Sequence, residues 1–258
     1  MRKGIFSYFG YELNFKESIN LIHKYGFNYT SLWYGNENIE YQNGEIEKAS
    51  KIAEGNGVVI ENVHTAFENA NFLWQDALGR SLIKREYEKC IRFCGRQGIS
   101  YMVIHPSKSS RPPKYNNEGL EILVSLLKTA KNEGVTIAIE NTRKVEYIDF
   151  IFENIDHRNL CICYDSSHDH LYGMPPIAII KKWGALIKLT HLSDNNGKED
   201  NHWLPGKGIV DWIKVIDALR KIKYKGVLNL EVFPQRKDED VETFLFDAQQ
   251  CLDKISEK

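Results

Sequence analysis

Nine side chains that can bind a divalent metal follow one another at the ends of short apolar segments of the chain. They are five histidines and four carboxylates: His64, His105, Glu140, Asp165, His168, His191, Asp200, His202 and Glu231. Mixed imidazole and carboxylate groups suit Zn²⁺, Mn²⁺, Fe²⁺ or Co²⁺ better than Ca²⁺. We therefore predict a centre of one to three divalent ions, zinc or manganese first, and no organic cofactor.

Nine candidate ligands exceed what a single ion takes, and two arrangements stay open. In the first, two or three ions share the ligands, activate water and stabilise a phosphoryl transition state. In the second, Glu140, Asp165, His191 and Glu231 hold one ion that binds adjacent oxygens of a polyhydroxy substrate. A carboxylate then moves a proton at the neighbouring carbon, and the other histidines bind substrate hydroxyls.

The segments that carry these side chains alternate between β-like and helical patterns. The predicted strands cover residues 3–8, 29–33, 58–64, 101–105, 136–140, 160–164, 187–191 and 227–232. The predicted helices cover residues 15–25, 46–54, 80–96, 118–133, 146–154, 176–183, 211–221 and 241–255. Several strands are almost continuously apolar, which is typical of parallel strands buried on both faces.

Eight such units predict an α/β fold, a (β/α)8 TIM barrel that forms one domain over residues 1–258. A doubly wound sheet is the alternative, but it seldom needs eight units, and no G-x-G-x-x-G motif follows the first strand. In a barrel the carboxyl ends of all strands meet at one rim. The nine side chains should therefore converge, and a metal gives several buried polar groups a partner at once.

The densest group of motifs lies in residues 191–212, HLSDNNGKEDNHWLPGKGIVDW. H-L-x-D, then D-x-H, then P-G-x-G-x-x-D-W resembles the sugar phosphate isomerase/epimerase group of the xylose isomerase-like TIM barrels. The D-x-H-x-x-x-G-x-G portion is shared with endonuclease IV. The resemblance covers nearly the whole chain, from the first predicted strand to the eighth.

The resemblance to ketose epimerases implies a metal-dependent isomerase or epimerase that moves a proton beside a metal-bound carbonyl. Its substrate would be a sugar, a sugar phosphate or a related polyhydroxy compound. Glu140, Asp165, His191 and Glu231 match the single-metal set of those enzymes, in which Glu140 and Glu231 would also form the acid/base pair. All nine residues match the three-zinc set of endonuclease IV, which implies the alternative of a phosphodiesterase acting on abasic DNA. A barrel that binds sugar or metal without turnover is a third hypothesis.

The chain departs from both branches of this superfamily. Endonuclease IV typically carries E-T-P at the last ligand, where this chain has Glu231-Val232-Phe233. Ketose epimerases usually place an Arg six residues after the His of the seventh strand, where this chain has Gly197.

Other side chains near the predicted rim are candidates for substrate binding. Trp33 follows the second strand and is predicted to stack on a sugar face, with packing of a loop as the alternative. The aromatic residues after the third strand, Phe67, Phe72 and Trp74, have the same two interpretations. Lys108, Arg111 and Arg143 are candidates for binding an anion such as phosphate, and Arg143 is preferred because it follows Glu140 by three residues.

Composition limits the partners. The net charge of −1 gives no basic field, so nucleic acid is disfavoured as a partner without being excluded. Five cysteines without disulfide spacing, and an N-terminus without an apolar leader, predict a cytoplasmic protein with free thiols. We expect a small sugar substrate and no membrane partner. Epimerases of this type are often dimers or tetramers, so the resemblance also implies a homo-oligomer.

Overall fold

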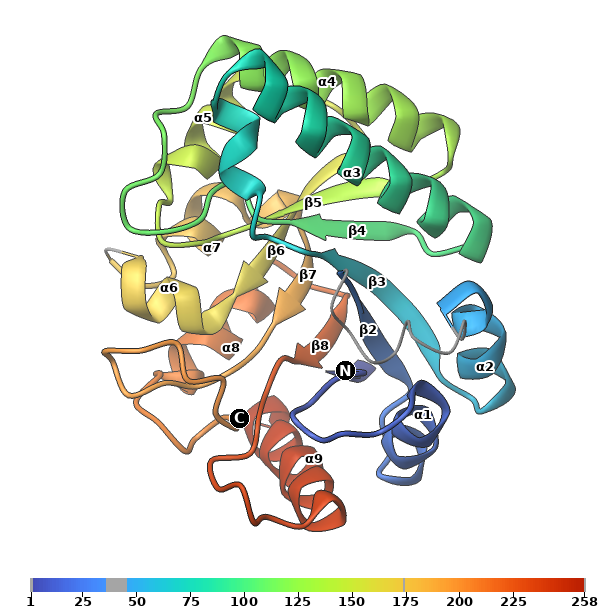
Figure 1. Cartoon of the computed structure of the whole chain (residues 1–258). Coiled ribbons are helices and arrows are strands. Elements are labelled where there is room, and N and C mark those ends of the chain that lie inside the picture. The colour runs from blue at the N-terminus through green and yellow to red at the C-terminus, as the bar shows by residue number, and fades with distance from the viewer. Residues whose placement is uncertain (1, 36–45, 174, 258) are drawn as a thin grey trace.

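Eight parallel strands form a nearly closed barrel in the computed structural model, which describes residues 2–35, 46–173 and 175–257 (Figure 1). The strands are β1 (Arg2–Phe6), β2 (Tyr29–Tyr34), β3 (Val59–Thr65), β4 (Tyr101–Ile104), β5 (Thr136–Glu140), β6 (Leu160–Asp165), β7 (Ile187–His191) and β8 (Val227–Leu230). Neighbours in the sheet follow the chain order from β1 to β7, and β8 pairs with β1. The predicted (β/α)8 barrel is thereby confirmed.

The barrel closes between β7 and β8, at a junction that we call the seam. A single parallel bridge joins Leu192 to Leu230 there. The amide of Leu192 donates to the Asn229 carbonyl at 2.8 Å, and the amide of Glu231 donates to the Leu192 carbonyl at 3.1 Å. The Thr190 hydroxyl donates to the first carbonyl of β8 at 2.9 Å, so a side chain supplies part of the contact.

Helices surround the barrel and cover the outer face of its strands (Figure 1). They are α1 (Phe15–Lys24), α2 (Ala49–Gly55), α3 (Ala77–Gln97), α4 (Asn117–Asn132), α5 (Glu146–Asn154), α6 (Ser166–Tyr172), α7 (Ala178–Trp183), α8 (Trp212–Lys221) and α9 (Val241–Glu257). Short 3-10 helices lie at η2 (Ile46–Lys48), η3 (Ala70–Trp74) and η4 (Gly184–Leu186). Among the described residues, none of the helices is both long enough and apolar enough to cross a bilayer.

Side-chain caps explain where several helices begin. The Asn14 side chain accepts a hydrogen bond from the amide of Glu17, and the Glu17 carboxylate accepts one from the amide of Asn14. Together they form a complete capping box for α1. The side chains of Asn116 and Asp211 cap α4 and α8, and each accepts one hydrogen bond from the amide three residues later.

Helix α6 was not predicted. It begins directly at the end of β6, because the Asp165 carboxylate accepts a hydrogen bond from the amide of His168 at 2.6 Å and so caps the helix. Between the predicted strand at residues 58–64 and the predicted helix at residues 80–96, the structure has η3 and the start of α3. The predicted strand at residues 227–232 is shorter, since β8 ends at Leu230.

A small apolar cluster fills the barrel below the candidate ligands. It consists of Val103, Ala138, Cys161, Cys163 and Leu189. Four of its members lie two positions before a candidate ligand of the same strand or strand end, so both side chains point to the same side of the sheet. All five cysteines are free, as expected.

Candidate metal centre

Four of the predicted ligands meet at the carboxyl end of the barrel. Glu140, Asp165 and His191 are the last residues of β5, β6 and β7, and Glu231 follows β8 directly. One ligand atom from each lies within 4.8 Å of the other three. His191 Nδ1 lies 2.9 Å from Glu140 Oε2 and 3.1 Å from Glu231 Oε2. We call these four residues the quartet.

Several polar atoms of the quartet are buried without a hydrogen-bond partner in the part of the chain that the structure describes. They are Asp165 Oδ2, His191 Nδ1 and Nε2, and Glu231 Oε2; His191 Nδ1 and Glu231 Oε2 lie at ion-pair distance from each other without the geometry of a hydrogen bond. A buried polar group left unpaired costs about 1–3 kcal/mol. A divalent cation would serve as their common partner, and one imidazole with three carboxylates is a donor set that zinc or manganese accepts. The residues present therefore fit a metal ion.

Glu140 is the hub of the centre and is almost fully buried. Its Oε2 lies 3.1 Å from His64 Nε2, and its Oε1 lies 3.4 Å from His105 Nε2 and 3.2 Å from His168 Nδ1. Burial by itself would raise the pKa of Glu140, but the charges of His105 and His191 hold that pKa well below its usual range. Glu140 is therefore ionised at neutral pH.

A second group of ligands, the Asp200 group, consists of His168, Asp200 and His202. Asp200 Oδ2 lies 2.9 Å from His168 Nε2 and 3.4 Å from His202 Nε2. The hydroxyl of Ser167 donates to Asp200 Oδ1 at 2.6 Å. Burial would lower the pKa of His202, but its contact with Asp200 raises it to about 10.

Three histidines are oriented by the protein backbone. The rings of His64, His168 and His202 each place Nδ1 against a carbonyl oxygen. The acceptors are Thr65, Asn141 and Glu231, at 2.7, 2.9 and 3.0 Å respectively. A carbonyl only accepts, so Nδ1 carries the hydrogen and Nε2 faces a carboxylate of Glu140 or Asp200. Such a contact needs a proton or a cation, and the same arrangement is common in histidines that bind metals.

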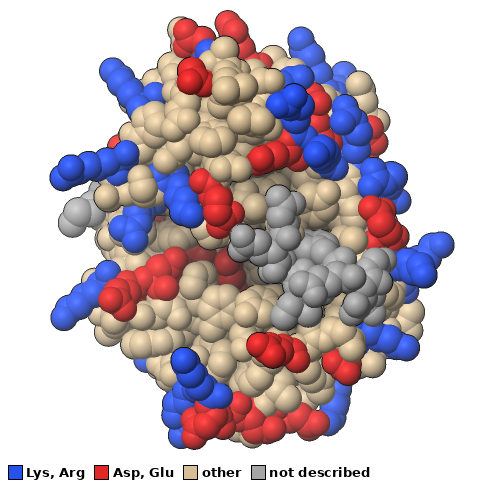
Figure 2. Space-filling model, viewed as in Figure 1, with Lys and Arg blue, Asp and Glu red and all other residues tan. Residues whose placement is uncertain are grey.

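The carboxylates of the centre repel one another. Burial raises the pKa of Asp165 to about 7; His168 opposes this shift, while Glu140, Asp200 and Glu231 add to it. A bound cation would relieve this repulsion. In Figure 2, Lys and Arg side chains extend mainly from the outer part of this face, and acidic groups reach into the hollow near its centre.

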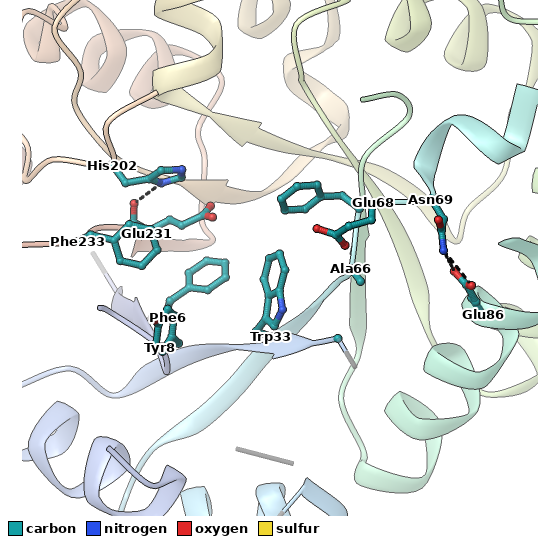
Figure 3. Close-up of a pocket in the computed structure, with 12 residues that line it drawn as sticks. Phe6, Tyr8, Trp33, Ala66, Glu68, Asn69, Glu86, His202, Glu231 and Phe233 are labelled. Atoms are coloured by element: carbon teal, nitrogen blue, oxygen red, sulfur yellow. Dashed lines mark hydrogen bonds between the residues drawn. The ribbon is translucent and has the colours of Figure 1, made fainter. Parts of the chain in front are cut away.

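An aromatic cavity of about 530 Å³ opens beside the quartet. Phe6, Trp33 and Phe233 line it together with Glu231 and His202 (Figure 3). The Trp33 ring stacks on the ring of His64, with centroids 4.8 Å apart and an interplanar angle of 15°. The structure thus places Trp33 in the wall of a cavity that a substrate can enter.

The aromatic residues after β3 divide between the site and the core. Phe67 lines the aromatic cavity and stacks on the ring of His105, with centroids 4.7 Å apart. Trp74 is buried and donates its indole hydrogen to the Pro106 carbonyl, and Phe72 packs against the core. Packing is therefore the better interpretation for Phe72 and Trp74.

A second, polar cavity of about 380 Å³ lies over the other side of the centre. Its lining includes Glu140, the Asp200 group and Glu231. Two of the three anion candidates, Lys108 and Arg143, also line it, whereas Arg111 is absent from the lining. Glu231 and His202 line both cavities, so the two spaces meet at the centre.

Asp194 organises the loop that carries Asp200 and His202, a role that was not predicted although the residue is the D of the H-L-x-D motif. Its fully buried carboxylate accepts four hydrogen bonds at 2.8–2.9 Å. The donors are the amides of Asn195, Gly206 and Val210 and the indole of Trp212. A Cβ at Gly208 would overlap the Asp194 carboxylate, so this position requires glycine. Residues 205–208 thus form a turn that Asp194 holds beside Trp203, the residue after His202.

Enzymes that act on sugars are among the proteins with related sequences. D-psicose 3-epimerase of Ruminiclostridium cellulolyticum is 24% identical over 210 residues, which cover 75% of this chain and 70% of that enzyme. Inosose isomerase of Bacillus velezensis is 26% identical over 178 residues, which cover 62% of each protein. The chain therefore spans less than two thirds of the length of the second enzyme.

Solved structures share the fold over almost the whole chain. D-psicose 3-epimerase with D-tagatose from Clostridium cellulolyticum has a TM-score of 0.82 at 19% identity, over 100% of this chain and 98% of that one. The IolI protein with a zinc atom has a TM-score of 0.75 at 22% identity, over 95% and 92% of the two chains. The family model for the xylose isomerase-like TIM barrel matches residues 19–250. With a match over most of its length, this chain belongs to the xylose isomerase-like TIM barrel family.

Proposed function

We propose that the protein is a metal-dependent isomerase or epimerase that moves a proton beside the carbonyl group of a sugar or sugar derivative. The observation that carries this proposal is the buried quartet, with ligand atoms within 4.8 Å of one another and four of its polar atoms unpartnered among the described residues. The related D-psicose 3-epimerase and inosose isomerase support a sugar substrate, and the zinc atom of IolI supports a divalent metal.

The quartet would hold the ion through one imidazole and three carboxylates. A divalent metal supplies positive charge that stabilises negative charge developing on a substrate carbonyl oxygen. The His64 and His105 side chains contact Glu140 and hold its carboxylate in place from the other side. The protein thus fixes the ligand geometry before substrate binds.

Glu231 and Glu140 are the proposed acid/base pair. Glu231 lines both cavities and Glu140 lines the polar one, so each carboxylate borders space that a substrate can occupy. Burial would raise the pKa of Glu231, but the contact with His191 lowers it, so Glu231 is ionised and ready to accept a proton. Phe6, Trp33 and Phe67 wall the cavity and exclude water from the reacting carbon.

Hydrogen–deuterium exchange tests this proposal. The metal-loaded protein is incubated in D₂O with D-psicose, D-tagatose, inososes and sugar phosphates, and exchange beside the carbonyl is followed by NMR. We expect exchange on at least one of these compounds and none on it after chelation. Absence of exchange on every compound, with metal bound, would rule out the proposed reaction.

A second candidate is a multi-ion phosphodiesterase, and the orientation of His64, His168 and His202 favours it. Each of these rings directs Nε2 at a carboxylate, and the Asp200 group lies outside the quartet. These residues could hold ions beyond the first, as hydrolysis of abasic DNA would need. Three zinc ions per chain by elemental analysis, together with incision of an abasic duplex, would establish this candidate over the isomerase. One ion and no incision would exclude it.

A further inference from the structure

We propose that the substrate carries an anionic group, a phosphate or a carboxylate, which binds in the polar cavity. The groups that bind it are Ser107, Lys108, Thr142 and Arg143, which we call the anion subsite. This inference rests on the proposed function, because the subsite shares its cavity with Glu140 and Glu231.

Two buried hydroxyl groups of the subsite lack a partner. Ser107 is 2% and Thr142 is 5% exposed, and neither Ser107 Oγ nor Thr142 Oγ1 has a hydrogen-bond partner among the described residues. Buried polar groups are nearly always satisfied in folded proteins. Both residues line the polar cavity, so a ligand oxygen there would give their O–H groups an acceptor.

Two cations lie at the same cavity. The guanidinium of Arg143 packs over the Tyr172 ring, 4.8 Å from its centroid, and forms no ion pair within the described chain. Its N–H donors are therefore available to an anion, which a guanidinium binds with two parallel hydrogen bonds. Lys108 Nζ lies over the Phe67 ring at 4.9 Å, and its nearest carboxylate, Glu68, is 3.9 Å away at an exposed position.

The subsite is fixed relative to the quartet. Thr142 and Arg143 follow Glu140 by two and three residues, and the intervening Asn141 makes two side-chain hydrogen bonds to the backbone of Asp165, both at 2.8 Å. On the other loop, the Asn71 side chain makes two hydrogen bonds to the backbone of Lys108, at 2.8 and 2.9 Å. An anion bound here would hold the reacting carbon at a constant distance from the acid/base pair.

The charges of the two cavities determine how a substrate would lie. The aromatic cavity contains Glu68 and Glu86, and the described residues of its lining include no Lys or Arg, so it disfavours an anion and suits the apolar face of a sugar ring. The polar cavity has Lys108 and Arg143 to offset the carboxylates of the centre. We infer that the anionic end of the substrate lies in the polar cavity and the sugar carbons face Trp33.

Ligand binding to the metal-loaded, full-length protein tests the subsite, with tryptophan fluorescence as the readout. The probes are a ketohexose, its 6-phosphate and the corresponding sugar acid. We expect at least one anionic probe to bind about tenfold more tightly than the free ketohexose. Arg143→Gln and Thr142→Val should each remove most of this preference and change the affinity for the free sugar by less than about twofold.

Arg111→Gln is the matched control, since it removes the same charge from the loop of Lys108 at a position outside the cavity lining. This variant should keep the full preference. A preference for the phosphate or for the acid would each support the subsite and would identify the bound group.

Equal binding of charged and free sugars by the wild type would overturn the subsite. A preference that survives both substitutions would also overturn it, because the anion would then bind elsewhere, for example on the metal. The proposed function fails separately, through absent exchange beside the carbonyl. Exchange on a free sugar without any anion preference would retain the function and remove the subsite.

Discussion

Glutamates at the two ends of the barrel have pKa values that are shifted in opposite directions. At the carboxyl end, the contacts with histidines lower the pKa of Glu140 and Glu231 despite their burial. At the amino end, Glu61 accepts one long hydrogen bond, 3.4 Å from the amide of Val227, and its Oε2 has no partner among the described residues. Burial therefore raises the pKa of Glu61 to about 7, although Val227 and Arg2 oppose the shift.

The difference shows what an ionised carboxylate needs inside a barrel. Burial favours the neutral acid at both ends, and the imidazoles at the carboxyl end reverse that preference for Glu140 and Glu231. At the same end Asp165 keeps a raised pKa, because burial and the neighbouring carboxylates outweigh His168. The small apolar cluster that includes Val103 and Leu189 lies between the candidate ligands and the amino end of the barrel. Barrel enzymes place their active sites at the carboxyl end and use the other end for stability. We therefore expect the same substitution to affect activity at one end and stability at the other.

The largest expected effect is on catalysis. Glu140→Gln should lower the exchange rate by about 10²–10⁴-fold, because it removes the carboxylate that we propose as metal ligand and as proton carrier. Glu61→Gln is the matched control at the amino end and should leave the rate unchanged. Both rates are measured by NMR on folded, metal-loaded protein. Comparable losses in the two variants would show that the ends do not differ in function.

Stability should depend on pH through Glu61. Its folded-state pKa is about 7 against an ordinary value of 4.5, so it contributes stability below pH 4.5 that is lost as the pH rises through 7. Glu61→Gln should therefore be more stable than the wild type above pH 7 by roughly 3 kcal/mol, and equal to it below pH 4.5. Chemical denaturation at several pH values measures the difference. A constant difference across this range would contradict the assigned titration.

Removal of metal should destabilise the protein through the carboxyl end alone. A ligand present at 100 times its Kd stabilises the folded state by about 2.7 kcal/mol, so chelation should lower the free energy of unfolding by about that amount. Thermal unfolding with and without chelator provides the measurement. The effect should shrink in Glu231→Gln and persist in Glu61→Gln. An equal effect in both variants would place the metal outside the quartet.

A smaller effect is expected from the loop beside the centre. In Asp194→Asn, an NH2 group would replace an oxygen that accepts from two donors, either Gly206 and Trp212 or Asn195 and Val210, so two buried hydrogen bonds would be lost. We expect a loss of about 2 kcal/mol in stability and weaker metal binding by the Asp200 group. Asp211→Asn is the control, because asparagine is also a good helix cap at that exposed position. Denaturation and metal analysis separate the two variants.

The sequence predicted the barrel, and the end of it at which the candidate ligands lie, for clear physical reasons. Parallel strands that are buried on both faces appear in the sequence as apolar runs. A polar residue that ends such a run lies at the rim of the barrel, because the strand ends there. This logic placed Glu140 and His191 correctly at the ends of β5 and β7. Their roles as metal ligands and the acid/base role of Glu140 stay predictions.

Tertiary contacts account for what was not predicted. Helix α6 begins because Asp165 both ends β6 and caps the helix, so no loop residues separate the two elements. In the sequence, Asp194 is one of several acidic residues in a polar segment. Its role is visible only in the folded protein, where four donors from different parts of that segment meet at its carboxylate. Ser107 and Thr142 are ordinary hydroxyl residues in sequence, and only their burial without a partner distinguishes them.

The seam gives the centre a mechanical role as well. His191 ends β7 and Glu231 follows β8, so the two ligands stand on opposite sides of the junction that a single bridge closes. An ion bound by both residues would hold β7 and β8 together at the seam, where one bridge joins them. Amide hydrogens near Leu192 and Leu230 would then exchange faster in the metal-free protein than in the metal-loaded protein, because the ion would slow the opening of the barrel at this point.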